Sequence, residues 1–214
     1  MKSILLAGLF LAASSVPHVA PGGLEGRIDT EIKLLTKGAT SQRDLVLYLV
    51  PKEPAAAAAK PGKATVTQKK LNFEPHVLPV RAGTTVEFVN EDQVKHNVFV
   101  DTECCKVDAD TDKGETKQQV FEKPGEYPIV CRLHPDMSMH VLALETDHFV
   151  RVELQKDKER SVEGKNVFTA TYRLEGVPPG TYTLRTWHKK CKPIEREVVI
   201  ADGKIDHLDL VLDR

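Results

Sequence analysis

A thiolate, two imidazoles and a thioether stand at spacings that suit a metal ion. Cys131, His134 and Met137 follow one another at three-residue steps in one short loop, and His96 stands on a separate apolar stretch. Two imidazoles and one thiolate form a trigonal set, and a weak axial thioether completes it in a way that favours copper. Zinc and calcium rarely recruit methionine. These residues therefore predict one copper ion per chain, cycling between Cu(I) and Cu(II).

A second thioether complicates the axial position. Met139 also follows His134, at a longer spacing than Met137. Met137 is the preferred axial ligand because it belongs to the shorter loop. Strand alternation that restarts at Ser138 would then place Met139 in the core. Met139 stays an alternative axial ligand at this point.

The composition excludes several classes of protein. The formal net charge of -1 gives no reason to expect a nucleic acid or a membrane surface as partner.

Residues 1–20 resemble a secretory signal peptide, with Lys2 before the apolar run Ile4–Ala13 and cleavage expected between residues 13 and 22. That run is too short to span a bilayer, and no other segment approaches the length needed. We therefore expect a periplasmic or secreted bacterial protein whose mature chain has no transmembrane segment.

An exported protein can contain disulfide bonds, because disulfides persist in an oxidising compartment. If Cys131 holds a metal, Cys104, Cys105 and Cys191 remain. A bridge from Cys104 or Cys105 to Cys191 would leave one thiol over, and the sequence does not fix the pairing. A bond between the adjacent Cys104 and Cys105 is disfavoured, since it needs a strained ring.

The secondary structure is expected to be all-β. Short apolar runs alternate with turns, and we find no convincing amphipathic helix; this pattern is typical of β-sandwiches. The stretch 51–61 is interpreted as a semi-rigid linker, and the acidic stretch 101–115 as a turn region. Within it, 108–115 is interpreted as a solvated acidic loop, because the glycine of a calcium site is displaced and the final glutamate is absent. The candidate strands are 24–35, 44–50, 65–67, 76–80, 84–89, 97–100, 119–121, 127–131, 140–144, 149–154, 167–174, 181–184, 195–200 and 206–212.

Residues 71–144 resemble a cupredoxin, the small blue-copper fold. The Cys-x2-His-x2-Met spacing is most similar to amicyanin and pseudoazurin, and the longer spacing to Met139 is similar to plastocyanin. The resemblance implies a Greek-key β-sandwich with His96, Cys131, His134 and Met137 as ligands. It also implies that Asn97 bonds across to the ligand loop and points its backbone N–H at the Cys131 sulfur. The segments that carry the resemblance are 73–80, 83–90, 96–99, 124–127 and 131–137.

A second resemblance concerns the flanking parts of the chain. Residues 174–184, Leu-Glu-Gly-Val-Pro-Pro-Gly-Thr-Tyr-Thr-Leu, resemble the carboxypeptidase regulatory-like, or transthyretin-like, β-sandwich. We predict that residues 24–56 and 147–214 form this module and that a cupredoxin domain of residues 57–146 is inserted into it. The layout is similar to bacterial exported plastocyanin-like proteins, some of them labelled methylamine-utilisation proteins. Tandem independent domains are the competing layout.

The leading functional hypothesis is an exported mononuclear type 1 (blue) copper protein that carries one electron. Its partner would be a c-type cytochrome or a copper- or haem-containing enzyme. Periplasmic copper binding or delivery is the alternative, although Cys-x-x-Cys and Met-rich tracts are absent. No His-x-His pair, Ser-His-Asp set or paired carboxylate stands out, so we expect no catalytic residues and no enzymatic activity.

Overall fold

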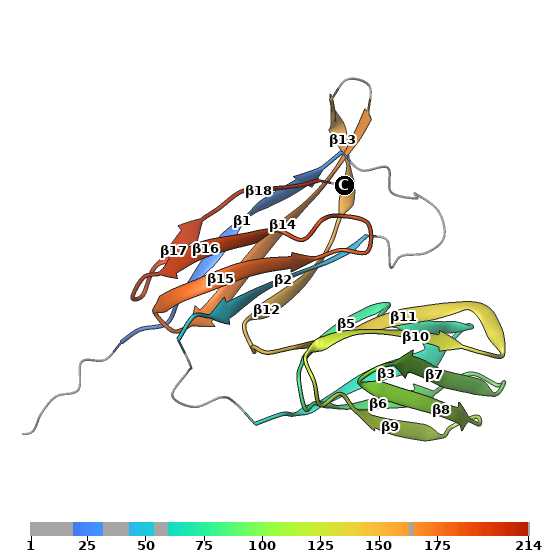
Figure 1. The fold of residues 1–214 in the computed structure, drawn as a ribbon. Coiled ribbons are helices and arrows are strands. Elements are labelled where there is room, and N and C mark those ends of the chain that lie inside the picture. Colours follow the sequence, from blue (N-terminus) through green and yellow to red (C-terminus); the bar gives the residue numbers. More distant parts are fainter. Residues whose placement is uncertain (1–18, 32–42, 54–59, 163–164, 214) are drawn as a thin grey trace, which may run out of the picture.

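The computed structural model describes residues 19–31, 43–53, 60–162 and 165–213. The regular elements in these ranges are β-strands, which form four sheets (Figure 1). The sheets enclose two large apolar cores, one for each β-sandwich. The expected all-β class is confirmed. The predicted signal peptide lies almost wholly outside the described residues, and none of the described segments forms an apolar helix of membrane-spanning length.

The first sandwich, shown in green and yellow in Figure 1, contains the residues of the predicted copper loop. Its sheets have the strand orders β5-β11-β10-β7-β8 and β4-β3-β6-β9. The strands are β3 (Lys63–Lys69), β4 (Asn72–Glu74), β5 (Val77–Arg81), β6 (Thr85–Asn90), β7 (His96–Thr102), β8 (Cys105–Thr111), β9 (Thr116–Val120), β10 (Gly125–Cys131) and β11 (His134–Leu144).

Alternation of side chains builds the core of this sandwich. Along β10, Tyr127, Ile129 and Cys131 are buried while the residues between them are exposed. Along β6, Val86 and Phe88 are buried in the same alternating way. Successive side chains of a strand point to opposite faces, so one row of each strand fills the space between the sheets. Cys131 is the last member of the inward row of β10, which places its thiol at one end of the core.

The second sandwich combines strands from both sides of the first. Strand β1 lies between β14 on one edge and β17 and β18 on the other, and β2 lies between β12 and β15. Residues before the copper-loop sandwich therefore pair with residues after it. The strands are β1 (Gly22–Thr30), β2 (Asp44–Pro51), β12 (Phe149–Glu153), β13 (Gln155–Val162), β14 (Lys165–Val177), β15 (Gly180–Trp187), β16 (Glu195–Ile200), β17 (Ile205–His207) and β18 (Leu210–Leu212).

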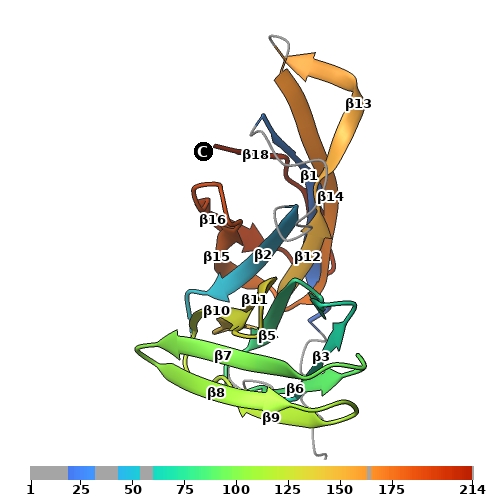
Figure 2. The same ribbon diagram turned by 90° about the vertical axis from the view of Figure 1, so that its right-hand side faces the viewer.

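A smaller apolar cluster joins the two sandwiches. It comprises Val46 of β2 together with Val77, Leu142 and Leu144, and Trp187 packs against it. The Trp187 indole N–H donates to Glu126 Oε2 at 2.9 Å. Contacts of both kinds, apolar and polar, therefore connect the sandwiches. Figure 2 shows one sandwich above the other, with β2 close to β10 and β11.

Three expectations about the strands need correction. The acidic stretch 101–115 is not a turn region throughout, and its part 108–111 is not a loop, because β8 runs through it and pairs with β7 along its length. Small and apolar residues of β8 alternate with the charged residues Lys106, Asp108 and Asp110, so the strand period of two is present although the stretch is acidic. The expected strand 206–212 is two strands, β17 and β18, and β1 ends at Thr30 with 32–35 outside the described residues. Strands β4 and β13 were not predicted.

The suggested disulfide to Cys191 is also wrong, because all four cysteines are free thiols. Cys104 and Cys105 lie at the turn between β7 and β8, and Cys105 packs against the core of the first sandwich. Cys191 packs against the core of the second. The partners that the sequence offered for a bridge thus belong to different sandwiches.

Candidate metal centre

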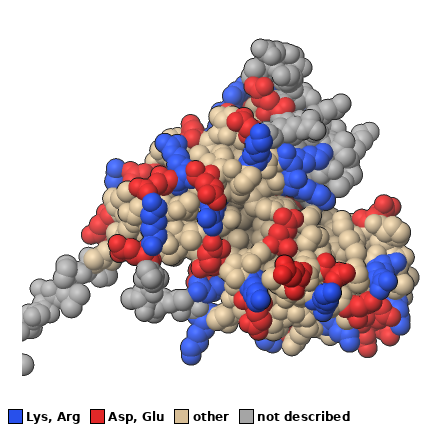
Figure 3. Space-filling model, in the orientation of Figure 1, with Lys and Arg blue, Asp and Glu red and all other residues tan. Residues whose placement is uncertain are grey.

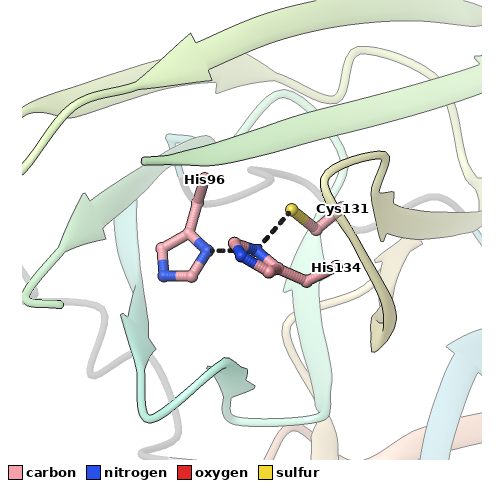
Figure 4. A group of neighbouring side chains, drawn as sticks. All are labelled: His96, Cys131 and His134. Atoms are coloured by element: carbon pink, nitrogen blue, oxygen red, sulfur yellow. Dashed lines mark hydrogen bonds between the residues drawn. The ribbon is translucent and has the colours of Figure 1, made fainter. Parts of the chain in front are cut away.

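Three strand ends bring the candidate ligands together. His96 begins β7, Cys131 ends β10 and His134 begins β11. Cys131 and His134 lie opposite one another where β10 turns into β11, and the register shifts between Val130 and Cys131. β7 is the other neighbour of β10, so all three residues stand at the same end of one sheet (Figure 4).

The donor atoms of these residues converge. The Nδ1 atoms of His96 and His134 are 3.2 Å apart, and Cys131 Sγ is 3.5 Å from His134 Nδ1. Within the described residues, this is the group of three His, Cys, Asp or Glu side chains that could hold a metal ion. His96 is fully buried, Cys131 is 1% exposed and His134 is partly exposed.

The hydrogen bonds of His96 and Cys131 leave the converging atoms free to bind a metal ion. His96 Nε2 lies 2.8 Å from Asp92 Oδ2. An ionised carboxylate only accepts, so Nε2 is the donor, and Nδ1 of the neutral imidazole then keeps its lone pair. On the other side, the backbone N–H of Asn97 donates to Cys131 Sγ at 3.3 Å. One thiolate and two imidazole nitrogens around one point are the donor set that copper prefers, so the residues present fit this metal.

Asp92 is suited to accept these bonds in its ionised form. Burial opposes ionisation of its carboxyl, but N–H groups of Leu71, Lys70 and His96 bond to it. Together they hold the pKa of Asp92 below its ordinary value. The one signal for this contact in the amino-acid sequence is a carboxylate four residues before a histidine.

Comparison with known proteins agrees with this geometry. Residues 45–143 match the family described as a cupredoxin-like domain. The plastocyanin of Ulva arasakii is 32% identical over 79 residues, which cover 32% of this chain and 81% of that protein. The chain belongs to the cupredoxin family. Copper is therefore its cofactor, one ion per chain.

Two solved structures are also similar to part of this chain. A purple cupredoxin from Nitrosopumilus maritimus is 24% identical with a TM-score of 0.34, over 38% of this chain and 99% of that one. Amicyanin from Paracoccus versutus is 24% identical with a TM-score of 0.36, over 45% of this chain and 91% of that one.

Both methionines that follow His134 are buried, and both lie on β11 and not in a loop. Met137 is 0% exposed and Met139 is 1% exposed, and both belong to the core of the first sandwich. They stand two residues apart on β11, so they share its inward face. Met139 lies opposite Ile129, whereas Met137 comes before the Val130–Ser138 pair, on the side of Cys131. This placement favours Met137 over Met139 as the neighbour of the candidate ligands.

Truncating each methionine should separate the two roles. Met137→Ala is expected to change the visible spectrum and the reduction potential of the copper-loaded protein. Met139→Ala should leave the spectrum unchanged and lower the free energy of unfolding by about 2–5 kcal/mol, the usual cost of such a core truncation. Visible spectroscopy, voltammetry and denaturant unfolding of both variants check this. A spectral change confined to Met139→Ala would reverse the assignment.

The side chain of Asn97 does not do what the family resemblance implied. Its Nδ2 donates to Asp108 Oδ1 at 3.0 Å and Asp110 Oδ1 at 2.9 Å, both on β8. The unpredicted strand β8 explains the difference, because it brings two carboxylates beside β7. The amide therefore ties β7 to β8, while the backbone N–H serves the Cys131 sulfur.

The charges near the centre are largely paired. Arg132, in the ligand loop, pairs with Asp108 and stacks over the ring of Phe99 at 4.7 Å. Lys95 lies 3.2 Å from Asp112 and 3.8 Å from Asp110. Acidic and basic side chains are interspersed over the face in Figure 3. The acids of β8 therefore do not form an unbalanced patch.

Proposed function

We propose that this cupredoxin is an exported type 1 copper protein that carries single electrons. The convergence of His96 Nδ1, Cys131 Sγ and His134 Nδ1 at one end of the first sandwich carries the proposal. Met137 would complete the set as axial ligand. Copper bound there would supply a one-electron couple between Cu(II) and Cu(I).

The residues of the chain would keep this set fixed while the charge changes. Each of the three donors sits at a strand end, and hydrogen bonds from Asn97 and to Asp92 hold the thiolate and one imidazole. Donors held in one arrangement need little movement between oxidation states, which makes electron transfer fast. Such contacts also tune the ligand strength.

Exposure supports His134 as the exit for the electron. His96 is fully buried, whereas His134 is partly exposed and its neighbour Leu133 is 49% exposed. A redox protein such as a c-type cytochrome, or a copper- or haem-containing enzyme, would dock at this end. Burial of His96 and Cys131 favours retention of the ion over its delivery to another protein.

We also propose the nested domain order, with a cupredoxin of residues 57–146 inside a carboxypeptidase regulatory-like module of 24–56 and 147–214. The pairing of β1 and β2 with strands that follow the cupredoxin supports it. The identity of the outer module rests on the resemblance of residues 174–184.

Spectra and a redox titration of the copper-loaded full chain test the function. We expect intense visible absorption, the small copper hyperfine splitting of a type 1 site in the electron paramagnetic resonance spectrum, and fully reversible one-electron reduction. A colourless Cu(II) site, or a copper that cannot be cycled, would refute the proposal. Unimpeded transfer of copper to an apo-acceptor would favour delivery instead.

A further inference from the structure

One carboxylate beside the copper centre accepts three hydrogen bonds from two different parts of the chain. Asp92 Oδ1 accepts from the backbone N–H of Lys70 at 2.7 Å. Asp92 Oδ2 accepts from the backbone N–H of Leu71 at 2.9 Å and from His96 Nε2 at 2.8 Å. The carboxylate thus joins a candidate copper ligand to the turn between β3 and β4.

That turn has an unusual backbone. Lys69 pairs with Asn72, so Lys70 and Leu71 are the two residues of a tight hairpin. Their φ angles are 53° and 57°, in the left-handed region that side chains other than glycine and asparagine disfavour. Two such angles in succession belong to the type I′ hairpin turn, which normally has Asn-Gly. The bonds to Asp92 compensate for the unfavourable residues by holding both N–H groups.

Asp92 is itself held from the buried side. Its backbone N–H donates to Asn90 Oδ1 at 2.9 Å. Asn90 is 1% exposed, and its Nδ2 donates to the backbone oxygens of Val94 and Thr111, each at 2.9 Å. The loop that presents Asp92 is therefore pinned to β8 on one side and to the start of β7 on the other. A carboxylate fixed in this way sets the orientation of whatever it binds.

We propose that Asp92 is a positioning residue of the copper centre, which holds the His96 ring with Nδ1 toward the metal and couples that ring to the turn of Lys70 and Leu71. The proposal rests on the proposed function for its consequence at copper. Leu71 is 49% exposed, so the turn lies at the surface. A change at this turn would then reach a ligand through one carboxylate, although no residue of the turn binds the metal.

Two substitutions of Asp92 remove different numbers of these three hydrogen bonds. Asp92→Ala removes all three hydrogen bonds. Asp92→Asn keeps one accepting oxygen and turns the other into an N–H donor. The amide is expected to place its oxygen where Oδ2 lies, because that position serves two donors, Leu71 and His96. Asp92→Asn should then lose the contact to Lys70 alone.

The copper-free protein gives the first readout. Nitrogen-15 NMR should show His96 of the wild type as a single neutral tautomer with the proton on Nε2, and slow amide exchange at Lys70 and Leu71. In Asp92→Asn, exchange should accelerate at Lys70 while the tautomer persists. In Asp92→Ala, exchange should accelerate at both residues and the Nδ1-protonated tautomer should appear.

Copper affinity gives the second readout, measured by competition with a chromophoric chelator. Asp92→Ala is expected to raise the copper dissociation constant about 10- to 100-fold, the usual effect of losing a residue that orients a ligand. Glu91→Gln is the matched control, because it removes the neighbouring carboxylate, which pairs with Lys69 and not with His96. Denaturant unfolding of each variant confirms that it is folded.

Two results would overturn the proposal. The first is a His96 tautomer in folded Asp92→Ala that is the same as in the wild type. The second is a copper affinity of Asp92→Ala equal to that of Glu91→Gln. A wild-type protein that binds copper without a type 1 spectrum would refute the proposed function, while the tautomer and the amide exchange would still decide whether Asp92 positions His96.

Discussion

Cys131→Ser is expected to abolish the intense visible absorption of the copper-loaded protein while the sandwich stays folded. The absorption needs a thiolate bound to Cu(II), and serine offers only a hydroxyl, which is a harder and far weaker donor at neutral pH. Cys131 is 1% exposed at the end of the inward row of β10, and serine fits the same space. Absorption and electron paramagnetic resonance spectra, with metal analysis of the same samples, check this result.

Cys191→Ser is the matched control, because Cys191 also lies beside an imidazole. Its sulfur is 2.9 Å from His188 Nδ1, in the second sandwich. Burial raises the pKa of the Cys191 thiol to about 11, so it stays protonated at neutral pH and is a poor ligand. The spectrum of Cys191→Ser should therefore equal that of the wild type. Colour that survives in Cys131→Ser and disappears in Cys191→Ser would contradict this view of the centre.

The loop was predictable because its information is local. Cys131, His134 and Met137 lie within seven residues, and their types and spacing limit the metal before any fold is known. His96 could be added because the strand that it begins is apolar and belongs to the family pattern. The distances between donor atoms then follow from the way that β7, β10 and β11 end together.

Asp92 was missed because its role depends on two loops that are remote in sequence. Nothing in the types of Lys70 and Leu71 indicates a type I′ turn, which usually shows itself by asparagine and glycine. Only the folded backbone brings their N–H groups to the carboxylate that also meets His96. Strand β8 was missed for a different reason, since acidic residues on its exposed face hid the alternation of the other face.

The second large effect is expected in the outer sandwich, which is the second sandwich, formed by β1, β2 and β12 to β18. A fragment of residues 147–214 is expected to remain unfolded on its own. It lacks β1 and β2, which lie inside the two sheets and leave β12, β14 and β15 with unpaired edges when they are absent. It also loses four side chains of β1 and β2 that are 0% exposed in the core of this sandwich, namely Ile28, Leu45, Leu47 and Leu49.

The size of the loss decides the outcome. Full burial of such a side chain contributes about 1.5–3 kcal/mol. Four of them amount to about 6–12 kcal/mol, similar to the whole stability of a domain at about 5–15 kcal/mol. Circular dichroism and denaturant unfolding of the fragment measure this. A cooperative unfolding transition in the isolated 147–214 fragment would favour tandem domains over the nested order.

Restoring the missing strands supplies the complementary test. β2 and β12 are antiparallel with Tyr48 opposite Phe149, so the chain leaves the outer sandwich beside the place where it returns. A short glycine-serine linker that replaces residues 54–146 should therefore close the gap as a hairpin connection and restore a folded outer sandwich. The complementary fragment, 60–146, keeps β3 to β11 and the core around Phe88 and should fold and bind copper by itself. If the linked outer sandwich stays unfolded while 60–146 folds, the outer strands depend on the cupredoxin for stability and do not form a module of their own.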